Sequence, residues 1–131
     1  MSWKPKLWHI LVATGIAFVG VVAGLVAAIV AFGGTAPVDN KFGDQHLKTT
    51  VALLELHRTR FGAYPATLSD LTYIGDWDPI ALGSVRYCPN AARTAYFVDV
   101  TRGWIGRPHL TYPATFWTGT GYRASLISIC P

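Results

Sequence analysis

Charged residues are scarce in this chain and unevenly placed. Asp, Glu, Lys and Arg make up only 14% of its 131 residues, and none lies between Ile10 and Phe32. A buried helix of a soluble protein would carry a polar stripe, but these 23 residues contain only Thr14 as a polar side chain. As a helix they would reach about 34 Å, which exceeds a hydrocarbon core of about 30 Å. The segment 10–32 is therefore predicted to be a transmembrane helix.

Cysteine is almost absent. The two that occur, Cys88 and Cys130, have no Cys-x-x-Cys spacing, which excludes the usual zinc, thiol-redox and haem-attachment motifs. In an oxidising compartment such a pair most simply forms a disulfide, and closing a loop of 43 residues would stabilise the domain by about 4 kcal/mol. Two unpaired buried thiols are the alternative.

A strong excess of one charge is also missing. The chain has 11 basic and 7 acidic residues, a formal net charge of +4, and Lys4 and Lys6 supply two of the positive charges. Both signs are mixed in the rest of the chain, which argues against nucleic acid as a partner. No nucleophile, phosphate-loop or metal-ligand motif occurs, so we expect no catalytic residue, no cofactor, no metal ion and no enzyme activity. The four histidines are scattered along the chain: His9, His46, His57 and His109.

The positions of Lys4 and Lys6 also predict an orientation. They precede the predicted span, whereas residues 33–37 contain no Lys or Arg. Because positive charge is retained in the cytoplasm, residues 1–9 are predicted to be cytoplasmic and residues 33–131 periplasmic, in a bacterial inner membrane. A cleaved signal peptide is the rival interpretation, but its apolar core is usually about 7–15 residues long. We therefore expect a retained anchor.

The predicted span carries a stripe of small residues. Its members step by four, three, four, three and four positions, so they share one helix face. Small side chains let a second helix approach closely, which predicts packing against other integral membrane subunits. A segment this rich in Gly and Ala can also show such a stripe by chance. The stripe consists of Ala13, Ala17, Gly20, Gly24, Ala27 and Ala31.

Residues 33–43 are predicted to form a short linker, followed by a domain at 44–131. Asp44 is the expected N-cap of an amphipathic helix over residues 45–60, in which Leu47, Val51 and Leu54 recur on one face. Gly62 can end that helix. The short linker should keep the domain close to the membrane lipid.

From Ser84 onward the pattern changes to strands. Short β-branched or alternating runs lie at residues 85–88, 95–101 and 122–129, bounded by Pro, Asn and Gly. A helix followed by such strands predicts an α+β domain, in which the amphipathic helix packs on a small antiparallel sheet.

The stretch 103–121 is rich in Gly, Pro, Thr and aromatic residues. A loop this long is uncommon without a function or a clamp of its own. Trp, Tyr and Arg anchor protein interfaces, so this stretch is a candidate docking surface, and filling of a small core by the aromatic rings is the alternative. The candidate docking residues are Arg102, Trp104, Arg107, Tyr112 and Trp117.

Residues 53–71 end in the pattern Gly62-x-Tyr64-Pro65-x-x-Leu68-x-x-Leu71. With a membrane helix before it and strands after it, this arrangement resembles the type IV pilin and type II secretion pseudopilin superfamily, and most closely the major pseudopilin. The resemblance implies a pilin-like fold in which Gly62 ends the helix, Tyr64 packs back and Pro65 directs the chain along the sheet. A cysteine pair that clasps the C-terminal sheet also resembles pilins.

The chain departs from that family in three respects. It lacks the prepilin processing motif, and the span contains no acidic residue where the family has a glutamate. It also has no Asp or Glu between Trp104 and Cys130 to coordinate the calcium ion of the major pseudopilin. We therefore expect a non-catalytic, single-pass accessory or structural subunit of a larger membrane complex, for which respiratory and photosynthetic complexes are natural hosts. A pseudopilin-like component of a type II secretion or type IV pilus machinery, assembled as a homo-oligomer, is the alternative.

Overall fold

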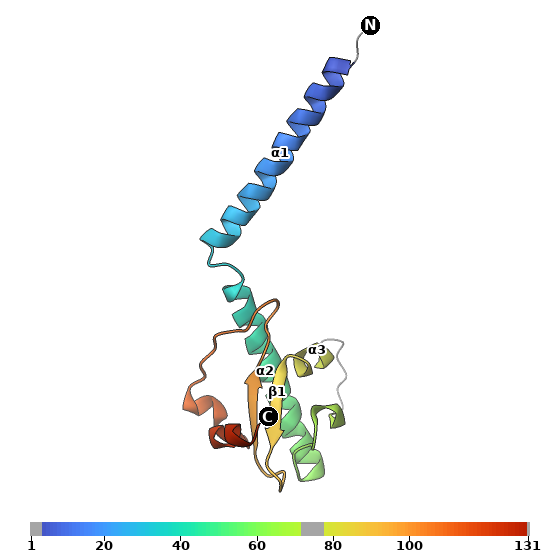
Figure 1. Cartoon of the computed structure of the whole chain (residues 1–131). Helices are drawn as coiled ribbons and strands as arrows, with labels where there is room; N and C mark the ends of the chain where they lie inside the picture. The colour runs from blue at the N-terminus through green and yellow to red at the C-terminus, as the bar shows by residue number, and fades with distance from the viewer. Residues whose placement is uncertain (1–3, 72–77, 131) are drawn as a thin grey trace. The chain divides into compact units, whose positions relative to one another are not determined.

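Two compact units make up the structure, residues 1–35 and residues 36–131. The computed structural model describes residues 4–71 and 78–130. Unit 1 contains helix α1 (Lys4–Ala31), coloured blue in Figure 1. Unit 2 contains helices α2 (Ala36–Phe61) and α3 (Asp78–Leu82), strands β1 (Val85–Pro89) and β2 (Tyr96–Val100), and the 3-10 helices η1 (Leu68–Asp70), η2 (Ala114–Trp117) and η3 (Ala124–Ile129).

Helix α1 covers the predicted apolar segment, although it ends one residue before the predicted boundary at 32 and begins well before residue 10. Over Lys6–Ala31 it is long and apolar enough to span a membrane, and every side chain in that range is exposed. Gly33 and Gly34 end the helix, because their φ angles of 83° and 69° are conformations that glycine adopts without strain. The Gly34 N–H donates a hydrogen bond of 2.8 Å to a carbonyl of the last turn.

Helix α2 begins at Ala36 rather than at residue 45, so the predicted linker 33–43 and the predicted domain start at 44 are wrong. Pro37 lies in the first turn, where a missing N–H costs nothing. Gly43 lies inside the helix, and the loop packs closely on it, because a Cβ built there would be 2.5 Å from Cγ of Pro108. Asp44 is not an N-cap; its carboxylate instead accepts a hydrogen bond of 2.7 Å from Lys48 one turn later.

The C-terminal end of α2 is as predicted. The Gly62 N–H donates to the Arg58 carbonyl at 2.8 Å, and the φ of Gly62 is 77°. Glycine takes this left-handed conformation freely, so the helix stops there and the chain turns back into Tyr64 and Pro65, both buried. The short helical turn η1 follows.

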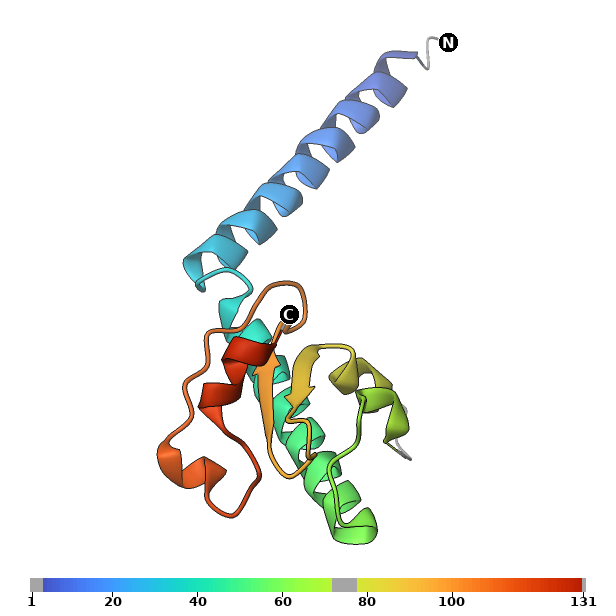
Figure 2. The ribbon, with the colours of Figure 1, turned by 60° about the horizontal axis from the view of Figure 1, so that its bottom comes forward.

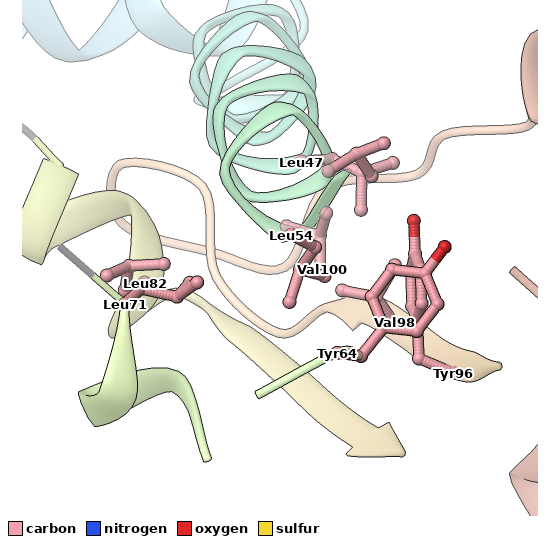
Figure 3. Close-up of a cluster of buried hydrophobic side chains, with 9 residues drawn as sticks. Leu47, Leu54, Tyr64, Leu71, Leu82, Tyr96, Val98 and Val100 are labelled. Carbon is pink, nitrogen blue, oxygen red and sulfur yellow. The ribbon is translucent and has the colours of Figure 1, made fainter. Parts of the chain in front are cut away.

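Strands β1 and β2 form a two-stranded antiparallel sheet, in register from Val85 opposite Val100 to Pro89 opposite Tyr96. Helix α2 runs along one face of this sheet, as both ribbon views show (Figures 1 and 2). Figure 3 shows the core between them, where Leu47 and Leu54 of α2 point toward β2. The fold of unit 2 is therefore α+β, as predicted. The buried core cluster consists of Leu47, Val51, Leu54, Tyr64, Leu71, Leu82, Tyr96, Val98 and Val100.

The predicted third strand at 122–129 is wrong. Only Tyr122 makes a bridge, a parallel one with Tyr96, and residues 124–129 form η3 instead. A strand continuing from Tyr122 would carry Cys130 about 26 Å away, at about 3.3 Å per residue. The predicted disulfide is present, however, and holds Cys130 at a Cα–Cα distance of 5.6 Å from Cys88 on β1. The tail must therefore cross the sheet compactly, and a 3-10 helix allows this.

Candidate docking surfaces of unit 2

The loop after β2 is fastened to the first turn of α2 by one carboxylate. Asp39 is 3% exposed, and its Oδ1 accepts the backbone N–H groups of Trp104 (2.8 Å), Ile105 (2.7 Å) and Gly106 (2.9 Å). Three N–H groups around one carboxylate oxygen form strong, charge-assisted hydrogen bonds. Gly103 has to be glycine, because an added Cβ would overlap the backbone of Asp39. We call residues 103–106 the loop tip.

A second polar contact holds the descending side of the same loop. The side-chain carbonyl of Asn40 accepts the backbone N–H of His109 at 2.8 Å. Adjacent residues of α2 therefore hold two places in a loop more than 60 residues later in the chain. The loop tip is a fixed part of unit 2, located beside the start of α2 (Figure 1).

The loop tip, α2 and α3 together form an apolar surface, which we call the Trp104 patch. It consists of Trp104 and Ile105 of the loop tip, Phe42 of α2 and Ile80 of α3. Trp104 is 60% and Ile105 65% exposed, and the Trp104 ring stacks on Phe42 with ring centroids 6.3 Å apart. Phe42, Ile80 and Trp104 line a shallow pocket of about 250 Å³ together with His46, Arg102 and Gly103. Neighbouring apolar side chains that are exposed together often mark an interaction site. This patch is therefore a candidate contact site.

A groove of about 270 Å³ follows the outer edge of β2. At the Tyr96 end of this edge, the Tyr96 N–H donates to the Gly121 carbonyl (2.9 Å) and the Tyr96 carbonyl accepts from the Arg123 N–H (2.8 Å). Because alternate residues face the same edge, the backbone groups of Val98 and Val100 face this groove, and they have no backbone partner there among the described residues. The groove is lined by Leu47, Phe97, Val98, Asp99, Val100, Pro108, Leu110, Thr111, Tyr112, Trp117 and Tyr122.

The five predicted docking residues do not form one surface. Arg102 and Trp104 line the pocket at the loop tip, and exposed Arg107 forms an ion pair of 2.7 Å with Asp99. Tyr112 and Trp117 line the β2 groove instead, and both are half-buried against the core. The structure thus combines the two alternatives, because one part of the loop is exposed and the other part fills the core.

A hydrogen-bond network around Glu55 lies within the core of unit 2, and sequence reasoning did not find it. The carboxylate of Glu55 on α2 accepts hydrogen bonds from the Tyr64 hydroxyl (2.9 and 3.0 Å), the Tyr96 hydroxyl (3.0 Å) and the Gly121 N–H (3.0 Å). Both tyrosines are fully buried, and their hydroxyls point the same way (Figure 3). One α2 side chain therefore joins the Tyr64 segment, β2 and the Gly121 turn.

Gly121 is required by this network. A Cβ added at position 121 would overlap the Tyr64 ring and hydroxyl. The only signals in the sequence were an isolated acidic residue on an amphipathic helix and a glycine near the end of a long loop. Neither identifies a partner about 66 residues away.

Burial of the tyrosines also affects their ionisation. Desolvation is the main cause that raises the pKa of Tyr64, Tyr87 and Tyr96 above the ordinary value, and the nearby Glu55 carboxylate raises the pKa of Tyr64 and Tyr96 further. Desolvation likewise raises the pKa of Tyr112 and Tyr122. The folded state therefore favours the neutral phenol in each case.

We expect unit 2 to lose stability in alkaline solution. A pKa that is higher in the folded than in the unfolded state gives stability that is complete below the unfolded value of about 10 and is lost as the pH rises above it. The urea midpoint, followed by near-ultraviolet circular dichroism, should stay level up to about pH 9.5 and fall steadily above pH 10. Tyr96→Phe should reduce the slope of that fall. A midpoint that does not change between these pH values would contradict the pKa shifts.

The predicted helix-packing residues lie on α1 and are all exposed. Ideal Cβ atoms built at Gly20 and Gly24 meet no described side chain of unit 1 within 4 Å. Packing within unit 1 therefore does not explain why these positions are glycine.

Among residues 4–71 and 78–130, no group of three or more His, Cys, Asp or Glu side chains is arranged to hold a metal ion. Comparison with protein-family models, with curated proteins and with solved structures finds no match to this chain.

Proposed function

We propose that this protein is a non-catalytic, single-pass accessory or structural subunit of a larger membrane protein complex. One observation carries the proposal. Helix α1 exposes an apolar surface over 26 residues, and a helix of this kind is stable only in a bilayer or against another apolar surface. Unit 2 then serves as the part that contacts other subunits from one side of the membrane. Respiratory and photosynthetic complexes are examples of suitable hosts.

Two features support a bacterial inner membrane with unit 2 in the periplasm. Basic residues precede the candidate span, and the positive-inside rule retains such residues in the cytoplasm. The disulfide between Cys88 and Cys130 favours an oxidising compartment for unit 2.

The small-residue stripe on α1 supports a helix of another subunit as partner. Glycine in a helix interior costs about 1 kcal/mol relative to alanine, so it usually has a compensating use. Within unit 1, no described side chain of α1 comes within 4 Å of a Cβ built at Gly20 or Gly24. Close packing against a second membrane helix is such a use, because lipid offers no hydrophobic driving force between helices.

A pseudopilin-like component of a secretion or pilus machinery is the second candidate. It is supported by a long helix packed on a small antiparallel sheet and by the buried Tyr64 and Pro65 after Gly62, which is the arrangement that the resemblance implies. The absence of an acidic residue from residues 10–32 favours the first candidate. The two differ in assembly: a pseudopilin forms a helical polymer of identical chains, whereas an accessory subunit is found with different proteins.

Replacing Gly20 and Gly24 by leucine tests the proposal. Bulky side chains on the stripe should weaken association with the partner subunits by about tenfold or more, the effect of about 1.4 kcal/mol. The measurement is quantitative recovery of co-purifying proteins after isolation of the full chain in mild detergent. Val22→Phe with Val26→Phe is the control, because these residues lie on the other side of α1 and each replacement adds four carbon atoms there, as Gly→Leu does.

Two results would overturn the proposal. The first is a wild-type chain that is a monodisperse monomer without companions at every detergent concentration that keeps it soluble. The second is equal co-purification by the glycine variants and their controls. Recovery of a homopolymer with helical symmetry would instead favour the pseudopilin-like candidate.

A further inference from the structure

We propose that the Trp104 patch inserts into the headgroup layer of the membrane on the side where unit 2 emerges, with Lys41 and Arg102 contacting anionic lipid phosphates. This inference rests on the proposed function, because it assumes that α1 spans the bilayer. It adds a second membrane contact, made by unit 2 itself, and identifies the face that makes it.

The length of the chain keeps the loop tip within reach of the bilayer. The candidate span ends at Ala31 and α2 begins at Ala36, so five residue steps connect them. Even fully extended, these steps reach only about 18 Å. Asp39, which holds the loop tip, lies in the first turn of α2. The opposite end of the helix, at Phe61, lies 22 residues or about 33 Å further along its axis.

The composition of the patch fits a lipid interface. Tryptophan is enriched at the membrane–water boundary, where its ring contacts apolar chains and its N–H remains close to water. Trp104 and Ile105 project from the loop tip at 60% and 65% exposure, with Phe42 behind them. Two large neighbouring side chains this exposed on a fixed loop lose little conformational entropy when they insert.

The charge around the patch has the sign that anionic lipids require. Lys41 and Arg102 are exposed, and the ion pairs that the structure gives for its described residues include neither of them. Asp39, the acidic residue that holds the loop tip, is 3% exposed and accepts three backbone N–H groups. Basic residues near a membrane surface bind anionic lipids with about 1 kcal/mol each, which is about a fivefold effect on binding.

Other exposed apolar side chains of unit 2 lack this combination. Phe61 is 68% exposed but lies at the far end of α2 and packs against His57. Ile127 and Ile129 are exposed on η3, a segment with no aromatic residue. The short connection from the candidate span to the start of α2, together with the exposed Trp104 ring, therefore selects the Trp104 patch.

The test measures contact with lipid in the full chain. Ile105→Cys is labelled with a fluorophore and the protein is reconstituted into phosphatidylcholine vesicles with and without phosphatidylglycerol, each containing lipids that carry a nitroxide quencher near the headgroup. The native cysteines are protected from labelling because they form the disulfide. Phe61→Cys is the matched control, because Phe61 is also an exposed apolar residue of unit 2. Val22→Cys, with a quencher at the centre of the bilayer, reports whether α1 spans.

The expected result is quenching at position 105 several-fold stronger than at position 61. Trp104→Ser in the labelled chain should abolish most of that difference, and omission of phosphatidylglycerol should reduce it, through loss of the contribution from Lys41 and Arg102. Retention of the disulfide and of near-ultraviolet circular dichroism in each variant shows that the fold is intact.

Equal quenching at positions 105 and 61, with strong central quenching at position 22, would overturn this inference and leave the proposed function standing. Absence of quenching at position 22 would overturn both. A label at position 105 that lipid does not quench, but that becomes shielded from aqueous iodide when the chain is isolated with companion subunits, would also overturn the lipid contact, because it assigns the patch to a protein partner.

Discussion

Replacement of Glu55 by alanine is expected to lower the free energy of unfolding of unit 2 by about 3–5 kcal/mol. The change leaves the Tyr64 hydroxyl, the Tyr96 hydroxyl and the Gly121 N–H without the acceptor that they share. Each buried donor left without a partner costs about 1–3 kcal/mol, and Tyr64 and Tyr96 are fully buried. Urea unfolding of the full chain in detergent micelles, followed by the near-ultraviolet signal of the tyrosines, measures the loss.

Two variants separate the network from other effects on α2. Glu55→Gln keeps one acceptor oxygen and should lose clearly less stability than Glu55→Ala. Lys48→Ala removes only an exposed ion pair with Asp44 on the same helix and should change stability by about 0.5 kcal/mol or less. If Glu55→Ala behaved like Lys48→Ala, the network would contribute nothing to stability.

Loss of the disulfide should have an effect of similar size. Cys88 and Cys130 are 42 residues apart, and removal of a crosslink of this span costs about 4 kcal/mol in the chain-entropy model. The double variant Cys88→Ser, Cys130→Ser should therefore unfold at a much lower urea concentration than the wild type. The η3 segment, whose described side chains are mostly exposed, has few other contacts to hold it.

Reducing agent provides the internal control for this prediction. Dithiothreitol should lower the urea midpoint of the wild type to that of the double serine variant and should leave the variant unchanged. An unchanged wild-type midpoint after complete reduction, verified by thiol titration, would show that the crosslink does not stabilise unit 2.

The predictable parts of the fold are those set by local patterns. The apolar run before residue 32, the spacing of Leu47, Val51 and Leu54, and the glycine after α2 each act within a few residues. The start of α2 was missed because Asp44 resembles an N-cap in the sequence, whereas it lies inside the helix and accepts a hydrogen bond from Lys48. The third strand was wrong because a β-branched run indicates strand, whereas the disulfide to β1 requires the tail to cross the sheet.

The candidate surfaces were only partly predictable for the same reason. Aromatic and basic residues in a long loop indicated a contact surface, and Trp104 is indeed the exposed ring at the loop tip. Sequence could not separate it from Tyr112 and Trp117, because burial of those two depends on their packing beside β2. Asp39 and Glu55, which hold the loop in place, act across more than 60 residues, and no local pattern reveals such contacts.

The clamp between Asp39 and the loop tip has a consequence for the order of events during synthesis. Helix α2 leaves the ribosome early, but the Trp104 N–H that Asp39 binds and the Gly121 N–H that Glu55 binds are made 65 and 66 residues later. Contacts this distant require the intervening chain to be ordered first, so they form late. Until the loop and the sheet are made, the Asp39 carboxylate and the apolar stripe of α2 lack the groups that cover them in the folded unit.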